Sequence, residues 1–301
     1  MIEAFGLTKR YGDKLAVDDL SFTVRPGMVT GFLGPNGAGK STTMRMLLDL
    51  DAPTGGRATV NGRRYREHRA PLREVGALLE AQAVHKGHTA RNHLRALAAT
   101  NGIPMSRVEE VLGIVGLESV AGKRAGGFSL GMGHRLGIAA ALLGDPATLV
   151  LDEPVNGLDP EGVLWVRTLL KRLAGEGRTV FVSSHLMSEM ALTADHLVVV
   201  GKGRLIADTS VSELTHQVAH DRVHVDSDDN GRLTALLGAD GTTVEPAPDG
   251  GLDVSGLTGI AIGQVALRAG IALSELTPQT ATLEEAFMSI TRDALDYTGE
   301  A

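Results

Sequence analysis

One eight-residue segment constrains this chain more than any other. Residues 34–41 read GPNGAGKS and fit the pattern G-x-x-x-x-G-K-[ST]. An apolar run typical of a buried strand, Met28–Leu33, precedes the segment, and a stretch with a helical pattern, Thr42–Leu50, follows it. Glycines in such a loop let backbone N–H groups close around phosphate oxygens, and the helix N-terminus adds the positive end of its dipole. The pattern therefore predicts a strand–loop–helix unit that binds the phosphates of a nucleotide.

Residue types within this loop predict separate roles. Lys40 is placed to reach the β- and γ-phosphates, and the Ser41 hydroxyl is a ligand for Mg²⁺. We expect the nucleotide to contact Asn36, Gly37, Ala38, Gly39, Lys40, Ser41 and Thr42.

A second apolar run, Thr148–Leu151, ends in the acidic pair Asp152 and Glu153. One carboxylate at the end of a buried strand can hold Mg²⁺, which would be Asp152. The adjacent Glu153 points the other way and can activate an attacking water. Taken alone, an acidic pair after a strand is more often a solvated turn. The phosphate loop elsewhere in the chain favours the catalytic interpretation.

A third apolar run, Thr179–Val182, is followed by Ser183, Ser184 and His185. A lone histidine is usually a surface residue or a satisfied polar one. At the carboxyl end of a strand in an open parallel sheet, where ligands bind, it can instead contact the γ-phosphate and orient the water. We therefore predict that Glu153 and His185 are catalytic.

Charge and composition exclude several classes of protein. The 29 basic and 36 acidic residues give a net charge of −7, without the basic excess of a nucleic-acid binder. The absence of cysteine fits a reducing compartment. The N-terminus, which has an acid at Glu3, does not resemble a signal peptide. No stretch reaches the ~18 consecutive apolar residues of a membrane-spanning helix, so we expect the chain not to cross a membrane by itself.

The periodicity divides the chain into two domains. Residues 1–212 alternate apolar runs with helical patterns, which predicts an α/β core, and about residues 85–145 form a mostly helical subdomain inserted in it. Residues 213–301 follow the order β-α-β-β-α-β, which suggests a small α+β, ferredoxin-like domain. A closing amphipathic helix, Thr282–Arg292, begins with Thr282 as N-cap and Glu285 completing a capping box. The strands and helices expected within the second domain are Arg222–Asp226, Arg232–Leu237, Thr242–Glu245, Leu252–Val254, Ile260–Ala269 and Leu273–Leu276.

Five motifs stand in one order: the phosphate loop, Phe128–Met132 (FSLGM), Leu149–Glu153, Gly157–Asp159 (GLD) and His185. Over about residues 1–210 this order resembles the ATP-binding cassette of ABC transporters. The resemblance implies a P-loop NTPase fold, an ATPase activity, and ATP with Mg²⁺ as ligands. FSLGM stands where the family has its LSGGQ signature, with leucine and methionine replacing a glycine and the glutamine.

The resemblance also implies a dimer. In the family each site is completed when two cassettes close face to face, and the signature of one subunit contacts the γ-phosphate held by the other. Ser129 and Gly131 would make that contact, with Ser129 capping the helix that follows, and Asp159 would reach across the dimer interface.

Two further residues take expected roles from the resemblance. Tyr11 would stack on adenine, a task that suits a flat aromatic ring, although a turn tyrosine is the alternative. Glu80 stands after the strand Val75–Leu79, where the family carries a glutamine that senses Mg²⁺ and communicates with the membrane subunit. Gln82 is an alternative for that role, and we favour Glu80.

Together, Leu78–Glu80 and the FSLGM segment are similar to the ATPase subunits of exporters that confer antibiotic resistance, including bacitracin and lantibiotic exporters. Such a subunit works with a separate membrane permease on the cytoplasmic face of the membrane. A cassette protein acting on ribosomes or DNA is disfavoured by the single phosphate loop and the acidic charge. A P-loop kinase would not explain Phe128–Met132 or His185. For the second domain we favour a packing or dimer-stabilising role, and a regulatory ligand site stays open.

Overall fold

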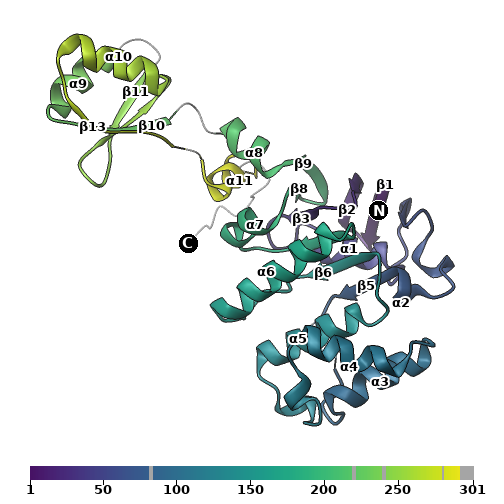
Figure 1. Ribbon diagram of the computed structural model, residues 1–301. Helices are drawn as coiled ribbons and strands as arrows, with labels where there is room; N and C mark the ends of the chain where they lie inside the picture. Colours follow the sequence, from purple (N-terminus) through teal and green to yellow (C-terminus); the bar gives the residue numbers. More distant parts are fainter. Residues whose placement is uncertain (81–83, 219–221, 239–241, 280, 292–301) are drawn as a thin grey trace, which may run out of the picture. The chain divides into compact units, whose positions relative to one another are not determined.

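The computed structural model describes residues 1–80, 84–218, 222–238, 242–279 and 281–291 (Figure 1). The architecture is mixed α/β, as the sequence predicted, and helices flank a central parallel sheet. Within the described ranges no helix combines the length and the apolar character that crossing a membrane requires.

The central sheet has six strands in the order β5-β6-β7-β3-β8-β9. The first five are parallel and β9 is antiparallel. Every residue of β3 and β7 is buried, which explains why both read as continuous apolar runs. The three apolar strands predicted from the sequence are confirmed to within one residue at each end. The strands are β3 (Val29–Leu33), β5 (Val75–Leu78), β6 (Thr148–Asp152), β7 (Thr179–Ser183), β8 (His196–Gly201) and β9 (Arg204–Ser210).

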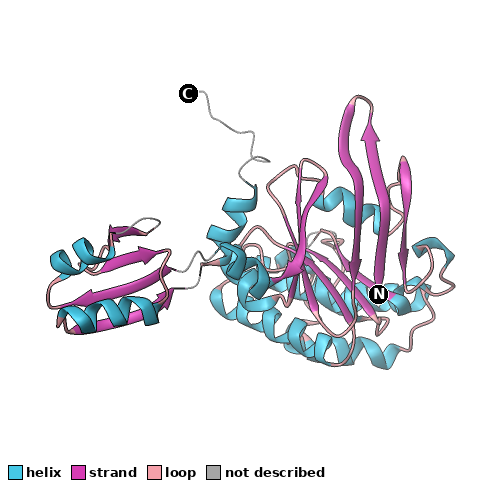
Figure 2. Ribbon diagram, turned by 90° about the horizontal axis from the view of Figure 1, so that it is seen from above, coloured by secondary structure: helices cyan, strands magenta, loops and turns pink. Residues whose placement is uncertain are grey.

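A second sheet is antiparallel and has the order β2-β1-β4 (Figure 2). Its strands are β1 (Ile2–Tyr11), β2 (Lys14–Val24) and β4 (Gly55–Val60). One apolar core joins both sheets and the helix α1 (Lys40–Leu47) that follows the phosphate loop. The rings of Phe22, Phe32 and Phe181 meet in this core with centroids 5.0–5.7 Å apart. The loop is therefore anchored on both sides by packed secondary structure.

The predicted helical insertion is confirmed between β5 and β6. The apolar positions that predicted a helix there, Val108, Val111, Leu112 and Val115, are all fully buried. The helices of the insertion are α3 (Ala90–Thr100), α4 (Met105–Ile114), η2 (Glu118–Val120), η3 (Ala125–Gly127) and α5 (Leu130–Leu142). The helices η1 (Tyr65–Glu67) and α2 (Pro71–Glu74) precede β5, and α6 (Pro160–Gly175) and α7 (Met187–Thr193) follow β6.

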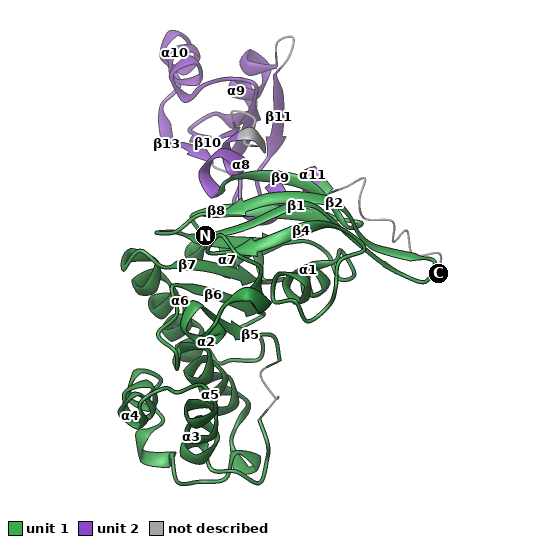
Figure 3. Ribbon diagram, turned by 90° about the vertical axis from the view of Figure 1, so that its right-hand side faces the viewer, with its two compact units in different colours: residues 1–210, 291–301 green, residues 211–290 purple. Residues whose placement is uncertain are grey.

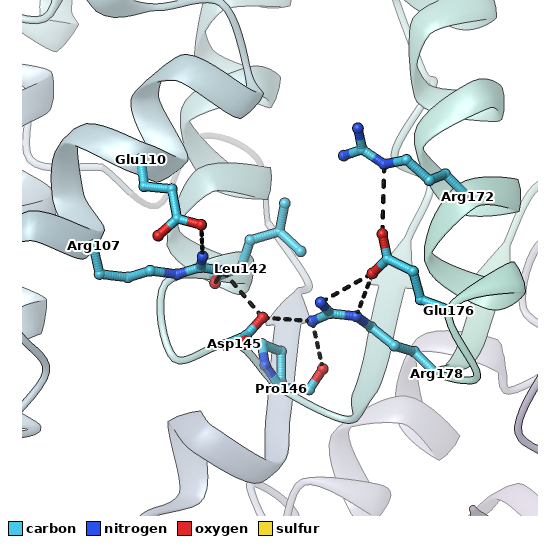
Figure 4. A network of polar contacts seen from close by, with 8 residues as sticks. All are labelled: Arg107, Glu110, Leu142, Asp145, Pro146, Arg172, Glu176 and Arg178. Carbon is cyan, nitrogen blue, oxygen red and sulfur yellow. Dashed lines mark hydrogen bonds and ion pairs between the residues drawn. The ribbon is translucent and has the colours of Figure 1, made fainter.

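A polar network joins the helical insertion to the core (Figure 4). Asp145 Oδ1, at the start of the chain's return to β6, lies 3.2 Å from Arg107 of α4 and 2.9 Å from Arg178. Arg107 also donates to the Leu142 carbonyl at 3.0 Å, and Arg178 pairs with Glu176 at 3.1 Å. Because Asp145 is 60% exposed, each pair contributes about 1 kcal/mol or less. The network therefore orients the insertion more than it stabilises the fold.

Residues 211–290 form the second compact unit, and residues 1–210 with 291–301 form the first (Figure 3). Four antiparallel strands in the order β11-β12-β10-β13 pack on an apolar core of their own, which includes Val225, Leu233, Val254 and Ile262. The unit's elements are α8 (Val211–Val218), β10 (Arg222–Ser227), α9 (Asn230–Leu237), β11 (Thr243–Pro246), β12 (Leu252–Ser255), α10 (Gly259–Ala269), β13 (Leu273–Gln279) and α11 (Leu283–Thr291).

Each strand and helix expected in residues 222–279 is found within a few residues of its predicted bounds. The predicted capping box before α11 is also confirmed. The Thr282 amide donates to the Glu285 carboxylate at 2.8 Å, and the Glu285 amide donates to the Thr282 hydroxyl at 3.2 Å. Arg292, the predicted end of this helix, lies outside the described residues.

Candidate nucleotide-binding site

Glycine is required at two positions of the loop between β3 and α1. Gly39 has φ +100°, in a region that favours glycine, and a Cβ there would lie 2.6 Å from the Ala16 carbonyl oxygen. A Cβ on Gly34 would lie 2.4 Å from the Val200 carbonyl oxygen. Side chains are excluded at both places because the backbone of neighbouring elements comes so close. The loop is thereby held in a tight turn that directs its end into α1.

Lys40 lies inside this loop. Its ammonium donates to the carbonyl oxygens of Gly34 at 2.6 Å and Pro35 at 3.3 Å, and the residue is 8% exposed. Burial lowers the pKa of Lys40, while the nearby carboxylates of Glu153 and Asp152 act to raise that pKa. A lysine ammonium in a glycine-rich loop is a complement for phosphate.

A cavity of about 410 Å³ opens beside the loop, within the range of small-ligand sites. Residues from the antiparallel sheet, the phosphate loop, α1 and the ends of β5 and β6 line it together. Most of the residues predicted to bind nucleotide line this cavity. Ala38 does not line it: the residue is buried, and its amide donates to the Pro35 carbonyl. The lining residues are Tyr11, Lys14, Ala16, Asn36, Gly37, Gly39, Lys40, Ser41, Thr42, Leu79, Asp152 and Glu153.

The two carboxylates sit where β6 ends. Asp152 is the last residue of the strand, and Glu153 turns the chain with φ +50°, a left-handed conformation that is unusual outside glycine. His185 Nδ1 lies 2.7 Å from Glu153 Oε2, so the ring holds the carboxylate from the side of β7. The structure thus brings the two predicted catalytic residues into contact beside the cavity that Lys40 lines.

Ser183 is a residue of the site that the sequence analysis did not single out. Its hydroxyl donates to Asp152 Oδ1 and accepts from the Glu153 amide at 3.0 Å. The only signal available in the sequence was its position at the end of a predicted strand. Strand order and register, which place Ser183 opposite Asp152, are properties of the fold.

The oxygen donors suit a magnesium ion. Ser41 and Asp152 both line the cavity, and Mg²⁺ usually takes one or two carboxylates together with substrate phosphates and water. Among the described residues no three His, Cys, Asp or Glu side chains gather into an all-protein metal site. Glu80 lines a different cavity of about 360 Å³, with Arg45 and Tyr65. Gln82, the alternative to Glu80, lies outside the described residues.

Tyr11 lies at the rim of the larger cavity and is 46% exposed. Its hydroxyl donates to Asp51 Oδ2 at 2.8 Å, and the Lys9 ammonium lies 4.8 Å from the ring centroid. Partial burial, and then the hydrogen bond to Asp51, raise the pKa of Tyr11. The phenol is therefore neutral and oriented, as a stacking platform for a base requires.

Three predicted nucleotide contacts lie away from this cavity within one chain. Ser129 caps α5, its hydroxyl accepting from the Met132 amide at 3.3 Å, and Gly131 lies in the first turn of that helix. Asp159 caps α6 and accepts from the Gly162 amide at 3.0 Å. None of the three lines the cavity beside Lys40.

Comparison with protein families gives three matches. Residues 17–156 match the family described as ABC transporter. Residues 123–191 also match an AAA domain family, and residues 221–284 match a domain of unknown function.

Proteins whose names describe transport or drug resistance align with this chain. The bacitracin transport ATP-binding protein BcrA of Bacillus licheniformis is 43% identical over 217 residues, which is 71% of this chain and 71% of that protein. The lantibiotic transport ATP-binding protein SrtF of Streptococcus pyogenes is 35% identical, over 69% and 90%. The daunorubicin resistance ATP-binding protein DrrA3 of Streptomyces coeruleorubidus is 34% identical, over 96% and 95%.

Solved structures share the fold of the first unit. An ATP-binding subunit of an ABC transporter superposes with a TM-score of 0.66 and 26% identity, over 72% of this chain and 92% of that one. A dimeric ATP-binding cassette in a post-hydrolysis state, bound to ADP and Pi, superposes with a TM-score of 0.63 and 22% identity, over 70% and 98%.

Proposed function

The chain belongs to the ABC transporter family, and on that premise we propose that it is the ATP-binding and ATP-hydrolysing subunit of an exporter. The exported compound would be a drug, an antibiotic or a peptide, moving through a separate permease. The names of the bacitracin, lantibiotic and daunorubicin relatives support this class of substrate. The observation that carries the proposal is the single cavity lined by Lys40, Ser41, Asp152 and Glu153, with His185 on the Glu153 carboxylate.

The residues around the cavity divide the work of hydrolysis. Lys40 and the loop amides bind the β- and γ-phosphates. Ser41 and Asp152 would hold Mg²⁺, which when bound neutralises charge on the phosphate oxygens. Glu153 accepts a proton from the water that attacks the γ-phosphorus, and ADP leaves. His185 keeps the Glu153 carboxylate in place through Nδ1. In the charged form of the ring, which has a hydrogen on both nitrogens, its other nitrogen can also donate to the γ-phosphate.

We also propose that two copies complete each site. Ser129 and Gly131 of one copy would contact the γ-phosphate bound to the other, and Asp159 would lie at the interface. Two features support this arrangement: Ser129 and Asp159 each cap the N-terminus of a helix, and neither lines its own chain's cavity. A cassette with the same fold was solved as a dimer.

The permease partner would dock on the second cavity. Leu48, Leu50, Tyr65 and Glu80 line it at the junction of the core and the helical insertion, and its lining is mostly apolar. Docking there would place the chain on the cytoplasmic face of the membrane. A charged Glu80 beside apolar side chains supports a role in sensing the docked partner.

For the domains we propose residues 1–212 as the ATP-binding domain, with the helical subdomain at about 85–145, and residues 213–301 as an accessory domain. The β-α-β-β-α-β order and the strand order β11-β12-β10-β13 support a ferredoxin-like fold for the accessory domain. A packing or dimer-stabilising role is the one we favour.

ATP hydrolysis in Mg²⁺ and in EDTA tests the proposed activity. We expect phosphate release only with Mg²⁺, and loss of release in Lys40→Ala, because that substitution removes the buried cation of the loop. Lys171→Ala, which removes an exposed lysine from α6, is the matched control and should hydrolyse ATP normally. Equal hydrolysis by Lys40→Ala, or in EDTA, would contradict the proposal.

A further inference from the structure

We propose that Ser183 is a positioning residue that ties the metal-binding carboxylate and the catalytic base into one unit. The proposal rests on the proposed function and extends it to a residue outside the sequence motifs. Ser183 is fully buried at the end of β7 and does not line the cavity. Its action would therefore pass through Asp152 and Glu153.

The parallel register of β6 and β7 creates this contact. Asp152 and Ser183 are paired across the two strands, and each is the last residue of its strand. The Ser183 hydroxyl, which has one hydrogen to donate, directs it to Asp152 Oδ1. The second carboxylate oxygen, Oδ2, remains for an ion or its water. The bond thus selects one orientation of the Asp152 carboxylate.

The same hydroxyl holds the backbone of Glu153. The Glu153 amide donates to Ser183 Oγ at 3.0 Å, and Glu153 has φ +50°. A non-glycine residue keeps a left-handed conformation only when its surroundings impose it. This turn sets the direction in which the Glu153 side chain leaves the backbone. At the other end of the side chain, His185 Nδ1 holds Glu153 Oε2 at 2.7 Å. Ser183 and His185 therefore hold the base at its two ends.

One atom thus couples two functions that differ in chemistry. If the hydroxyl is lost, the Asp152 carboxylate loses a donor and the Glu153 amide loses its acceptor. Both changes act on geometry that Mg²⁺ and water use, while the phosphate loop keeps its own contacts. Substitutions of residues that orient a metal ligand typically reduce metal affinity or activity by about 10- to 100-fold.

Ser183→Ala is the informative variant because alanine fits the site and lacks the hydroxyl. Thr148→Val is its matched control. Thr148 is also fully buried, stands at the opposite end of β6 and donates its hydroxyl to Asn61 at 2.9 Å. Ser183→Ala loses two hydrogen bonds and Thr148→Val loses one, so both should lower the melting temperature, Ser183→Ala by at least as much as the control. Only Ser183→Ala removes a contact to the carboxylates.

Binding of AMP-PNP, measured by calorimetry with Mg²⁺ and with EDTA, provides a readout besides turnover. For Ser183→Ala we expect about tenfold weaker binding with Mg²⁺ and binding within about twofold of wild type in EDTA. With ATP, kcat should fall about 10- to 100-fold while KM at saturating Mg²⁺ changes by less than about threefold. Thr148→Val should match wild type in all of these constants.

A double-mutant cycle tests whether Ser183 acts through Asp152. In an Asp152→Asn background, adding Ser183→Ala should change Mg²⁺-dependent AMP-PNP binding by less than about twofold, because the carboxylate it orients is gone. A tenfold further loss in that background would overturn the assignment. A Ser183→Ala protein with the same Mg²⁺-dependent AMP-PNP binding and the same kcat as Thr148→Val would overturn it too and leave the proposed function standing. A wild type without Mg²⁺-dependent binding would overturn both.

Discussion

Alanine at Gly39 should strongly weaken nucleotide binding without unfolding the chain. Gly39 has φ +100°, and a left-handed backbone costs an L-residue about 1–2 kcal/mol. A Cβ there would also lie 2.6 Å from a backbone carbonyl, that of Ala16, and such overpacking adds about 1–3 kcal/mol. The sum is about 3 kcal/mol, which corresponds to a loss of ATP affinity of about 100-fold, at 1.4 kcal/mol for each factor of ten.

Substitutions at two other glycines separate the backbone strain from the steric overlap of the added Cβ. Gly37 has φ +82° and no neighbouring atom within 4 Å of a Cβ, so Gly37→Ala carries the backbone strain alone. We expect it to weaken ATP binding by about 5- to 30-fold. Gly27 has φ +81°, has equally open surroundings and lies outside the cavity. Gly27→Ala should lower the melting temperature and leave ATP affinity unchanged.

The assay is calorimetric titration of each variant with ATP in EDTA, together with its melting temperature. The order of affinities should be wild type and Gly27→Ala, then Gly37→Ala, then Gly39→Ala. If Gly39→Ala bound ATP within threefold of Gly37→Ala, the steric argument would be refuted.

Two further predictions concern histidines. His185→Ala should reduce kcat by about 10²- to 10³-fold with KM within about threefold, since the ring orients the Glu153 base, and steady-state phosphate release measures this. The pKa of His224 is raised, chiefly by its hydrogen bond to Asp253 and further by Asp249, so the folded state favours the charged ring. Its contribution of about 1 kcal/mol should be complete below pH 6.5, the ordinary histidine pKa, and disappear as pH rises through the raised value. Urea unfolding at pH 5.5 and 8 checks this, and His224→Asn should flatten the difference.

Local signals predicted the elements of this protein well. β3, β6 and β7 are continuous apolar runs because each is covered on both faces, and such runs are legible without the fold. The capping box of Thr282 and Glu285 is equally local, since its partners lie three residues apart.

The antiparallel sheet was not predicted, and its strands explain why. β1 changes register against β2 between Ala4 and Leu7 and again before Lys9. These shifts break the period-two pattern that identifies a half-buried strand, because the next buried residue after Ala4 is Leu7, three positions on. Periodicity cannot show a strand whose alternation is interrupted in this way.

In the candidate site too, some residues follow from local sequence motifs and others depend on the fold. Lys40, Ser41, Asp152 and Glu153 belong to continuous motifs, so their proximity followed from strands ending at one edge of a sheet. The role of Ser183, the left-handed turn at Glu153 and the placement of Glu80 on another cavity depend on register and tertiary packing. The catalytic and binding roles themselves stay predictions that the variants above test.

Size-exclusion chromatography with light scattering on Glu153→Gln tests whether two copies of the chain together form each ATP site. The substitution keeps the shape of the side chain and removes the base, so ATP should bind without being hydrolysed. We expect a monomer without nucleotide and a dimer with Mg²⁺ and ATP, because each site would need Ser129 and Gly131 of a second copy. A protein that binds ATP and stays monomeric, or that hydrolyses ATP at the wild-type rate, would contradict the proposal.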